Sequence, residues 1–278
     1  MFMQSKNPVF PVSGSVFFLC LVLLFSGGCA REPWTKPVDD NQAQTIRNMI
    51  QEKVKADAAC PSTLDAEVTV SMKTVMETKS FSGFLQLKLP SSVKFVTTNP
   101  LGQTVLALVS DGQSYRTVNT LNTQFISGSL STLALRNDIP QELLTGRWGI
   151  WLSDRIDIPK DTEITDIRQD ATARGIWIKL SNVKTKGEGP EYILVDPASK
   201  RPLLRMLMDA KENPIAMIEY ADWQDGPKCG QPATFHITGL SKGVEISIHL
   251  ADIITDKILT ERDFTLRPPP GYFIELRP

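Results

Sequence analysis

Beyond its first sixty residues, the chain consists mainly of short runs in which apolar and polar residues alternate. In EVTVSMKTVME, the residues Val68, Val70 and Met72 alternate with polar neighbours, which is typical of a half-buried β-strand. FSGFLQLKL continues the pattern from Phe81. Because successive side chains of a strand point to opposite faces, each run is expected to turn one face toward a core and the other toward water.

Residues that favour turns separate these runs. VKFV and TVLALV flank the turn NPLG and are expected to pair as a hairpin, and Asp111-Gly112 joins TVLALVS to QSYRTVN in a second hairpin. Later runs with strand character are EITDIRQD, ARGIWIKLS, EYILVD, LLRMLMD, PIAMIEYADW, ATFHITGL, VEISIHLADI and DFTL. Strands spaced about ten residues apart and joined by hairpin turns indicate an antiparallel meander that curves toward a barrel.

Two stretches interrupt the alternation. TIRNMIQEKVKADAA, from Thr45 to Ala59, places Ile46 and Ile50 on one side of an amphipathic helix. STLALRNDIPQELLTGRWGIW, from Ser131 to Trp151, has Pro140 at a position that suits a first helical turn, so a short helix is expected there. The predicted fold is mainly β (α+β): an incomplete antiparallel β-barrel with an N-terminal helix and a short helical lid over its mouth.

Several strands are apolar on both faces, although a sheet needs only one face for its core. Such positions are Val105, Leu106, Ala107, Leu108, Val109, Tyr192, Ile193, Leu194, Leu203, Leu204, Met206, Leu207 and Met208. The second face must contact helices, a neighbouring molecule or a ligand. The pattern leaves open whether the two helices cover that face or whether it lines an apolar cavity.

The N-terminus carries an export signal. An apolar run from Ser15 to Phe25 suits a signal-peptide core and is too short to span a membrane comfortably. It leads into SGGCA, which resembles the lipobox of bacterial lipoproteins, so that Cys29 would be lipidated and become the first mature residue. This predicts a signal peptide over residues 1–28, a flexible tether over residues 29–44 and a folded domain over residues 45–278. The alternatives are an ordinary cleaved signal with Cys29 merely nearby, and an uncleaved anchor.

The charge balance and the cysteines narrow the function classes. Lys+Arg 30 against Asp+Glu 31 gives a net charge of −1, so no chain-wide field attracts nucleic acid or anionic lipid. Of the four cysteines, Cys20 lies in the signal peptide and Cys29 is the lipid site. Cys60 and Cys229 remain, either as a disulfide in an exported compartment or as two unpaired buried thiols.

The sequence contains no recognisable catalytic constellation. No CxxC, HExxH, GxSxG or phosphate-binding glycine motif occurs. His236 and His249 have no Cys or His neighbour at metal-ligand spacing and are expected on polar strand faces. We therefore expect a protein that is not an enzyme and that uses no metal and no cofactor.

The turn TTNPLGQ contains one residue that the turn does not need. Asn99, Pro100 and Gly102 suit a tight bend. Leu101, by contrast, leaves apolar area in water unless something covers it. Either the domain covers Leu101 or a binding partner does.

The hairpin VKFVTTNPLGQTVLALVSDGQSY, from Val93 to Tyr115, is similar to that of the LolA/LolB family of lipoprotein localisation proteins, and most similar to its outer-membrane receptors, LolB. The lipobox at Cys29, the opening helix and the segment IPQELLTGRWG from Ile139 follow the same order. The resemblance implies an unclosed antiparallel β-barrel with a helical lid. Ala30 after the cysteine resembles the signal for export to the outer membrane.

By this resemblance, Leu101 protrudes from its turn and promotes the transfer of acyl chains into the membrane. The partners would be acyl chains of lipoproteins or phospholipid and a periplasmic LolA-like carrier, with the protein lipid-anchored to the outer membrane and facing the periplasm. The residues expected to line the acyl-chain cavity are Val70, Met72, Leu85, Leu87, Phe95, Leu143, Leu144 and Trp148. The alternative is a non-catalytic lipid-binding or structural envelope lipoprotein on the same scaffold.

Overall fold

The computed structural model describes residues 32–277 except 138, 145–146, 154, 185–188, 227–228 and 241–242. The expected signal peptide and Cys29 lie outside the described residues. Residues Trp34–Pro278 form one compact unit, which contains the helices and strands named below. Within the described residues, no helix is both long and apolar enough to cross a membrane.

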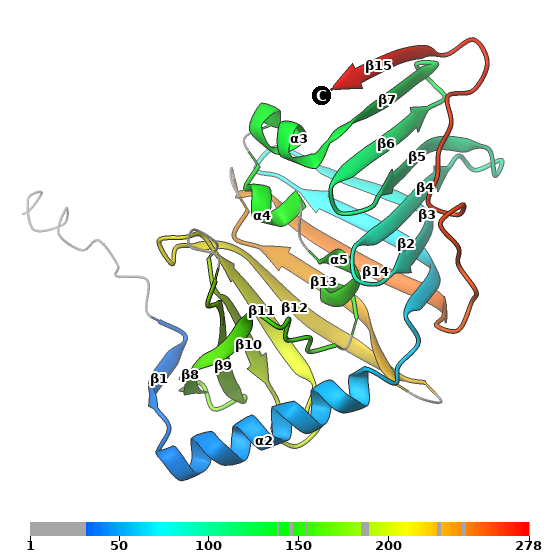
Figure 1. Cartoon of the computed structure of the whole chain (residues 1–278). Helices are drawn as coiled ribbons and strands as arrows, with labels where there is room; N and C mark the ends of the chain where they lie inside the picture. Colours follow the sequence, from blue (N-terminus) through cyan, green and yellow to red (C-terminus); the bar gives the residue numbers. More distant parts are fainter. Residues whose placement is uncertain are drawn as a thin grey trace, which may run out of the picture. The chain divides into compact units, whose positions relative to one another are not determined.

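The strands of the described residues form a single sheet (Figure 1). In chain order they are β1 (Trp34–Pro37), β2 (Thr63–Lys73), β3 (Thr78–Lys88), β4 (Ser92–Thr98), β5 (Thr104–Ser110), β6 (Ser114–Asn119), β7 (Gln124–Ser129), β8 (Thr162–Asp170), β9 (Ile176–Asn182), β10 (Glu191–Val195), β11 (Pro202–Met208), β12 (Pro214–Asp225), β13 (Gly230–Thr238), β14 (Glu245–Ile254) and β15 (Phe273–Arg277). Their order in the sheet is β1-β8-β9-β10-β11-β12-β13-β14-β2-β3-β4-β5-β6-β7-β15.

The sheet is open because β1 and β15 stand at its two free edges. The pairings are antiparallel except that of β15 with β7, which is parallel. The runs on either side of the NPLG turn pair as expected, with Val96 opposite Ala107. The predicted incomplete antiparallel barrel is confirmed.

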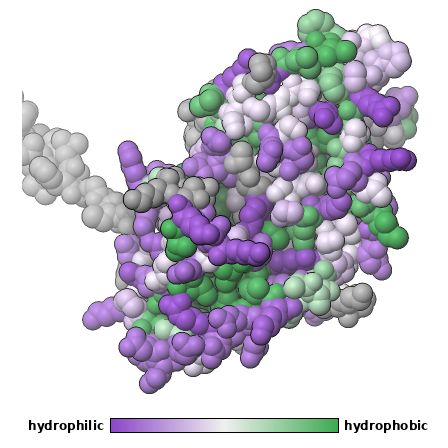
Figure 2. All heavy atoms as spheres, viewed as in Figure 1, coloured by the Kyte–Doolittle hydropathy of each residue, from purple (hydrophilic) through white to green (hydrophobic). Residues whose placement is uncertain are grey.

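The helices of the described residues cover one face of this sheet. They are α2 (Asp40–Asp57), α3 (Leu130–Asn137), α4 (Gln141–Leu144) and α5 (Trp148–Trp151). The register places Ile193 and Ile218 on the same face, which we call the inner face. Ile50 of α2 packs with Ile193, and Trp151 of α5 belongs to the same apolar cluster as Ile218. Figure 2 shows apolar side chains directly above α2, where this helix meets the sheet.

Where strands are apolar on both faces, other segments of the same chain cover the second face. On the face opposite the helices, the outer face, Ala107 and Phe125 are covered by Leu266 and Tyr272 of the C-terminal segment. At the other side of the sheet, Leu194 and Met206 belong to an outer cluster with Trp34, while α2 covers the inner face. Most of the doubly apolar pattern is therefore satisfied by the fold.

The expected tether over residues 29–44 is too long. The indole of Trp34 stacks on Tyr192 at 4.5 Å between ring centroids and lies edge-on to Trp177 at 5.7 Å, so the chain is already part of the sheet at β1. Asp39 then caps α2 by accepting a hydrogen bond from the backbone nitrogen of Gln42 at 2.9 Å. The folded unit starts at Trp34 because an aromatic site on β9 and β10 receives its side chain.

Two other expectations about elements were wrong in detail. DFTL forms a turn rather than a strand, and the last strand is β15, which pairs in parallel with β7. The expected single lid helix is divided into α3, α4 and α5. A hairpin turn in the sequence marks two antiparallel neighbours, but no such turn joins the two strands of this parallel pair. The sequence therefore gives no local sign of the pairing.

A buried arginine lies between the two helix-covered parts of the inner face. Arg205 stands between Ile193 and Ile218 in the register, and its side chain is 1% exposed. Its guanidinium donates to the Glu191 carboxylate and to the backbone oxygen of Arg155. Burial alone would lower the pKa of Arg205, but the nearby Tyr220 and Glu191 raise it above its ordinary value. The charge therefore stays in place between α2 and the lid helices.

A disulfide connects distant parts of the chain. Cys60, just after α2, is bonded to Cys229, just before β13, at a sequence separation of 169. Of the two possibilities that the sequence left open, the structure contains the bonded form.

Replacing both cysteines (Cys60→Ala with Cys229→Ala) is expected to lower the free energy of unfolding by about 2–5 kcal/mol, because the cross-link restricts the unfolded chain over a long loop. Urea denaturation of both proteins measures the difference. Addition of a reductant should bring the wild type toward the variant and leave the variant unchanged. Equal stability under oxidising conditions would show that the cross-link contributes nothing.

Candidate functional site

An apolar cavity of about 240 Å³ lies between the inner face of β2–β6 and the lid helices. Its lining residues are Val68, Val70, Leu85, Ser91, Val93, Phe95, Leu108, Ser110, Gly112, Tyr115, Leu130, Leu133, Leu144, Trp148, Leu152 and Ile248. None of these residues is charged. A cavity of about 150 Å³ with apolar walls can bind benzene, so this one has room for a larger hydrocarbon.

The walls follow from the alternation along neighbouring strands. Phe95 stands opposite Leu85 on one side and Leu108 on the other, so all three point to the inner face. Val70, Val93 and Phe95 pack against the main apolar cluster but stay half-buried. They stay half-buried because they border the cavity, which leaves apolar area without a protein partner.

The lid is attached to the sheet at one side of the cavity. The indole nitrogen of Trp148 donates to the backbone oxygen of Leu143 at 2.8 Å, which satisfies the polar edge of a ring whose apolar body faces the cavity. The backbone nitrogen of Gly149 donates to the oxygen of Pro90 at 3.0 Å. A Cβ at Gly149 would lie 2.7 Å from that same oxygen, so only glycine allows α5 this close to the β3–β4 turn.

The electrostatics of the cavity favour an uncharged ligand. The lining residues with hydroxyl groups are Ser91, Ser110 and Tyr115, and all three side chains are neutral. The cost of removing an ion from water without a partner is high, whereas a hydrocarbon chain gains by leaving water. The arrangement suits acyl chains and leaves a charged headgroup outside.

The predicted lining residues divide into two groups. Val70, Leu85, Phe95, Leu144 and Trp148 line the cavity. Leu87 instead borders the smaller cavity beside the disulfide, Leu143 is buried in the main apolar cluster, and Met72 is half-buried on β2 outside the lining.

Sequence reasoning missed other parts of the lining. Val93 and Leu108 share their strand face with Phe95, so the period of two could have identified them. Leu130, Leu133, Leu152 and Ile248 come together only through the tertiary fold.

Leu101 is not covered by the domain, because its side chain is 83% exposed. The carboxamide oxygen of Asn99 accepts hydrogen bonds from the backbone nitrogens of Leu101 and Gln103, both at 3.0 Å. The turn is therefore held by Asn99, and the leucine side chain contributes nothing to it. The alternative in which Leu101 packs back on the domain is wrong.

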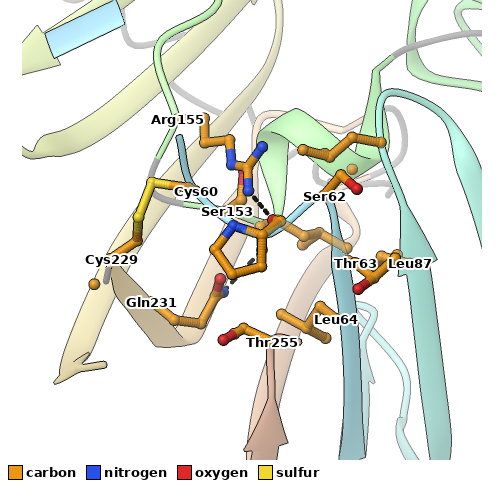
Figure 3. Close-up of a pocket in the computed structure, with 15 residues that line it drawn as sticks. Cys60, Ser62, Thr63, Leu64, Leu87, Ser153, Arg155, Cys229, Gln231 and Thr255 are labelled. Carbon is orange, nitrogen blue, oxygen red and sulfur yellow. Dashed lines mark hydrogen bonds between the residues drawn. A yellow bond between two sulfur atoms is a disulfide. The ribbon is translucent and has the colours of Figure 1, made fainter. Parts of the chain in front are cut away.

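A second, smaller cavity lies beside the disulfide (Figure 3). Its volume of about 30 Å³ is comparable to that of one water molecule. Gln231 Nε2 donates to the backbone oxygen of Leu152 at 2.9 Å, and the Arg155 guanidinium donates to that of Pro61. These bonds connect the lid to the strands around the disulfide, so this place is structural.

The two histidines lie away from the cavity. His236 and His249 are exposed and form hydrogen bonds with Ser247 at 3.1 Å and Thr234 at 3.0 Å, respectively. In the part of the chain that the structure describes, no group of three or more His, Cys, Asp or Glu side chains is placed to hold a metal ion.

Comparison with known proteins identifies the fold. No protein-family model and no curated protein matches the sequence. A domain described as an outer membrane lipoprotein-sorting protein from Vibrio parahaemolyticus aligns with 78% of this chain and 94% of its own length at 15% identity and a TM-score of 0.53. A LolA superfamily protein from Nitrosomonas europaea aligns with 79% and 97% at 11% identity and a TM-score of 0.54.

A DUF1329 family protein from Desulfovibrio piger aligns over the same shares, 79% of this chain and 97% of its own, at 11% identity and a TM-score of 0.55. At such identities the likeness concerns the fold alone. The chain therefore shares its open, mainly β fold with structures described as a LolA superfamily protein and a lipoprotein-sorting domain.

The cavity predicts that enlarging a lining residue is tolerated. Val93→Phe, which extends into the cavity, should change the free energy of unfolding by less than about 1 kcal/mol. Val195→Phe, the same change at a fully buried position under α2, should cost about 1–3 kcal/mol through overpacking. Urea denaturation of the two variants measures this, and an equal loss in both would mean that no usable space exists beside Val93.

Proposed function

We propose that this protein is a lipid-anchored receptor at the periplasmic side of the outer membrane. It takes acyl chains of lipoproteins from a LolA-like carrier into its cavity and helps to insert them into the membrane. The observation that carries this proposal is the cavity of about 240 Å³, whose lining contains no charged residue. An export signal with a lipobox at Cys29, the exposed Leu101 and the LolA-like fold support it.

Binding uses no covalent chemistry. Each methylene group that moves from water into the cavity contributes about 0.8 kcal/mol, so hydrocarbon enters because the inner face offers apolar area that the fold itself does not cover. The half-buried Phe95 and Trp148 are such places. Release into a bilayer is favourable when the membrane offers more apolar contact than the cavity does.

The same scaffold could instead serve as a structural envelope lipoprotein without a ligand. That function would need no free volume, and the lid helices could pack directly against Val93 and Leu108. The cavity between them therefore favours a lipid-binding role.

The binding proposal is tested by a fluorescent fatty acid titrated into the purified full chain after removal of lipid. Val93→Phe should weaken binding about tenfold, because it removes the space of about two methylene groups. Val75→Phe is the matched control, since Val75 is 89% exposed in the β2–β3 turn and is not part of the lining. Wild-type protein that binds no probe, with native mass spectrometry showing no co-purified lipid, would end the proposal.

The delivery proposal is tested in cells depleted of their own lipoprotein receptor. Leu101→Glu should retain probe binding but slow lipoprotein arrival at the outer membrane, because a carboxylate at this tip resists entry into an apolar phase. Fractionation of newly made lipoproteins between the two membranes measures arrival. Wild-type rates in the variant would show that the exposed leucine has no part in delivery.

A further inference from the structure

Three neighbouring turns at one end of the sheet each expose a large apolar side chain. Leu101 lies in the β4–β5 turn, Leu121 in the β6–β7 turn and Phe273 where the chain enters β15. Their side chains are 83%, 77% and 69% exposed. Figure 2 shows apolar surface at the top of the view, over β15. We call these three turns, residues 98–104, 119–124 and 268–273, the rim.

Hydrogen bonds join the three turns into one edge. Thr120 Oγ1 donates to the backbone oxygen of Thr104 at 2.8 Å, which connects the second turn to the first. The backbone nitrogen of Phe273 donates to the oxygen of Thr123 at 2.9 Å, which connects the third turn to the second. The three apolar side chains are therefore presented together.

The rim loses little when it leaves water. Charged residues make up 22% of the chain, yet the three rim segments contain none. Several polar side chains of the turns are hydrogen-bonded: Asn99 holds the first turn, the Asn119 carboxamide oxygen accepts from the backbone nitrogen of Asn122 at 3.2 Å, and Gln124 Nε2 donates to the Glu275 carboxylate just outside the rim at 2.9 Å. Burying a charge or an unpaired polar group costs free energy. The rim segments contain no charged residue, and the hydrogen bonds above pair the backbone amides of the first two turns.

Exposure alone does not define such a surface. Val75 and Met76 in the β2–β3 turn are even more exposed, but charged residues surround them. Lys73 pairs with Glu245, and Lys79 pairs with Glu77, all on side chains that are half exposed or more. These ions keep that turn hydrated, which distinguishes it from the rim.

We propose that the rim is a membrane-contact surface, with Leu101, Leu121 and Phe273 entering the bilayer interface together. A bilayer is the occupant because the rim presents separate apolar tips on uncharged turns, which suit a fluid apolar phase better than the shaped surface of a protein. The strands that carry Leu101 also line the cavity with Phe95 and Leu108, so the contact adjoins the binding site. Its role in delivery rests on the proposed function, but the membrane contact itself does not.

The test measures insertion at single positions in the full chain reconstituted into phosphatidylethanolamine–phosphatidylglycerol vesicles. The environment-sensitive dye NBD is attached to Leu101→Cys, Leu121→Cys or Phe273→Cys. Ile258→Cys is the matched control, because Ile258 is 90% exposed at the opposite end of the sheet beside Lys257. NBD at each rim position should shift to the blue and be quenched by nitroxide-labelled lipid, and NBD at Ile258 should do neither.

Each other outcome overturns the proposal. Quenching at Leu101 alone would reduce the contact to a single tip, and equal quenching at Ile258 would mean that the rim has no preference. Shielding that requires an added carrier protein and not lipid would assign the rim to a protein partner.

A double variant separates this inference from the proposed function. Leu121→Ser with Phe273→Ser should slow delivery about tenfold or more, because two apolar side chains no longer enter the membrane. It should leave fatty-acid binding unchanged, since neither residue lines the cavity. Rim quenching in a protein that binds no fatty acid would support the membrane contact and contradict the receptor function. Fatty-acid binding without rim quenching would support the binding function and contradict the membrane contact.

Discussion

An open curved sheet has to cover its apolar inner face with something other than an opposite wall, and the way it does so here determines the rest of the structure. One part of that face meets α2, an 18-residue helix that packs Ile50 fully into the sheet. The other part meets the lid helices α3, α4 and α5, which are eight, four and four residues long. Short helices cannot fill the width of the sheet, so the cavity lies on their side. Arg205, held by Glu191, stands between the two parts.

One hairpin combines three tasks because its two faces and its end have different neighbours. The inner face of β4 and β5 lines the cavity through Phe95 and Leu108. The outer face is covered by the C-terminal segment, which packs Tyr272 near Ala107. The end carries Leu101 in a turn that Asn99 holds. A change in the packing of the C-terminal segment would therefore reach both the binding site and the exposed tip.

The sequence predicted the parts of the structure that repeat locally. Strand alternation and turn residues were sufficient for the antiparallel open sheet, and the chemistry of the NPLG turn was sufficient to raise the question of Leu101. Val70, Leu85 and Phe95, which the resemblance led us to expect in the cavity, do line it.

The remaining features depend on contacts between segments far apart in the chain. Trp34 looks like part of a polar tether until Tyr192 and Trp177 supply an aromatic site for it. Arg205 sits in an apolar run, and only Glu191 and the backbone of Arg155 explain its burial. Leu87 lies on the same strand face as Leu85 but borders the smaller cavity beside the disulfide, which a period of two cannot distinguish.

The early start of the folded unit at Trp34 also limits how the molecule can sit on a bilayer. In the proposed function Cys29 carries the lipid, so four residues separate the anchor from Trp34, and a chain of that length spans at most about 17 Å. Trp34 pairs with Asp170, at the end of the sheet opposite Leu101. A strand of about nine residues is about 30 Å long. If the strands ran perpendicular to the membrane with the rim in the bilayer, Trp34 would lie farther from the membrane than the segment between Cys29 and Trp34 can reach. The β-strands would therefore lean toward the membrane plane rather than stand along the membrane normal.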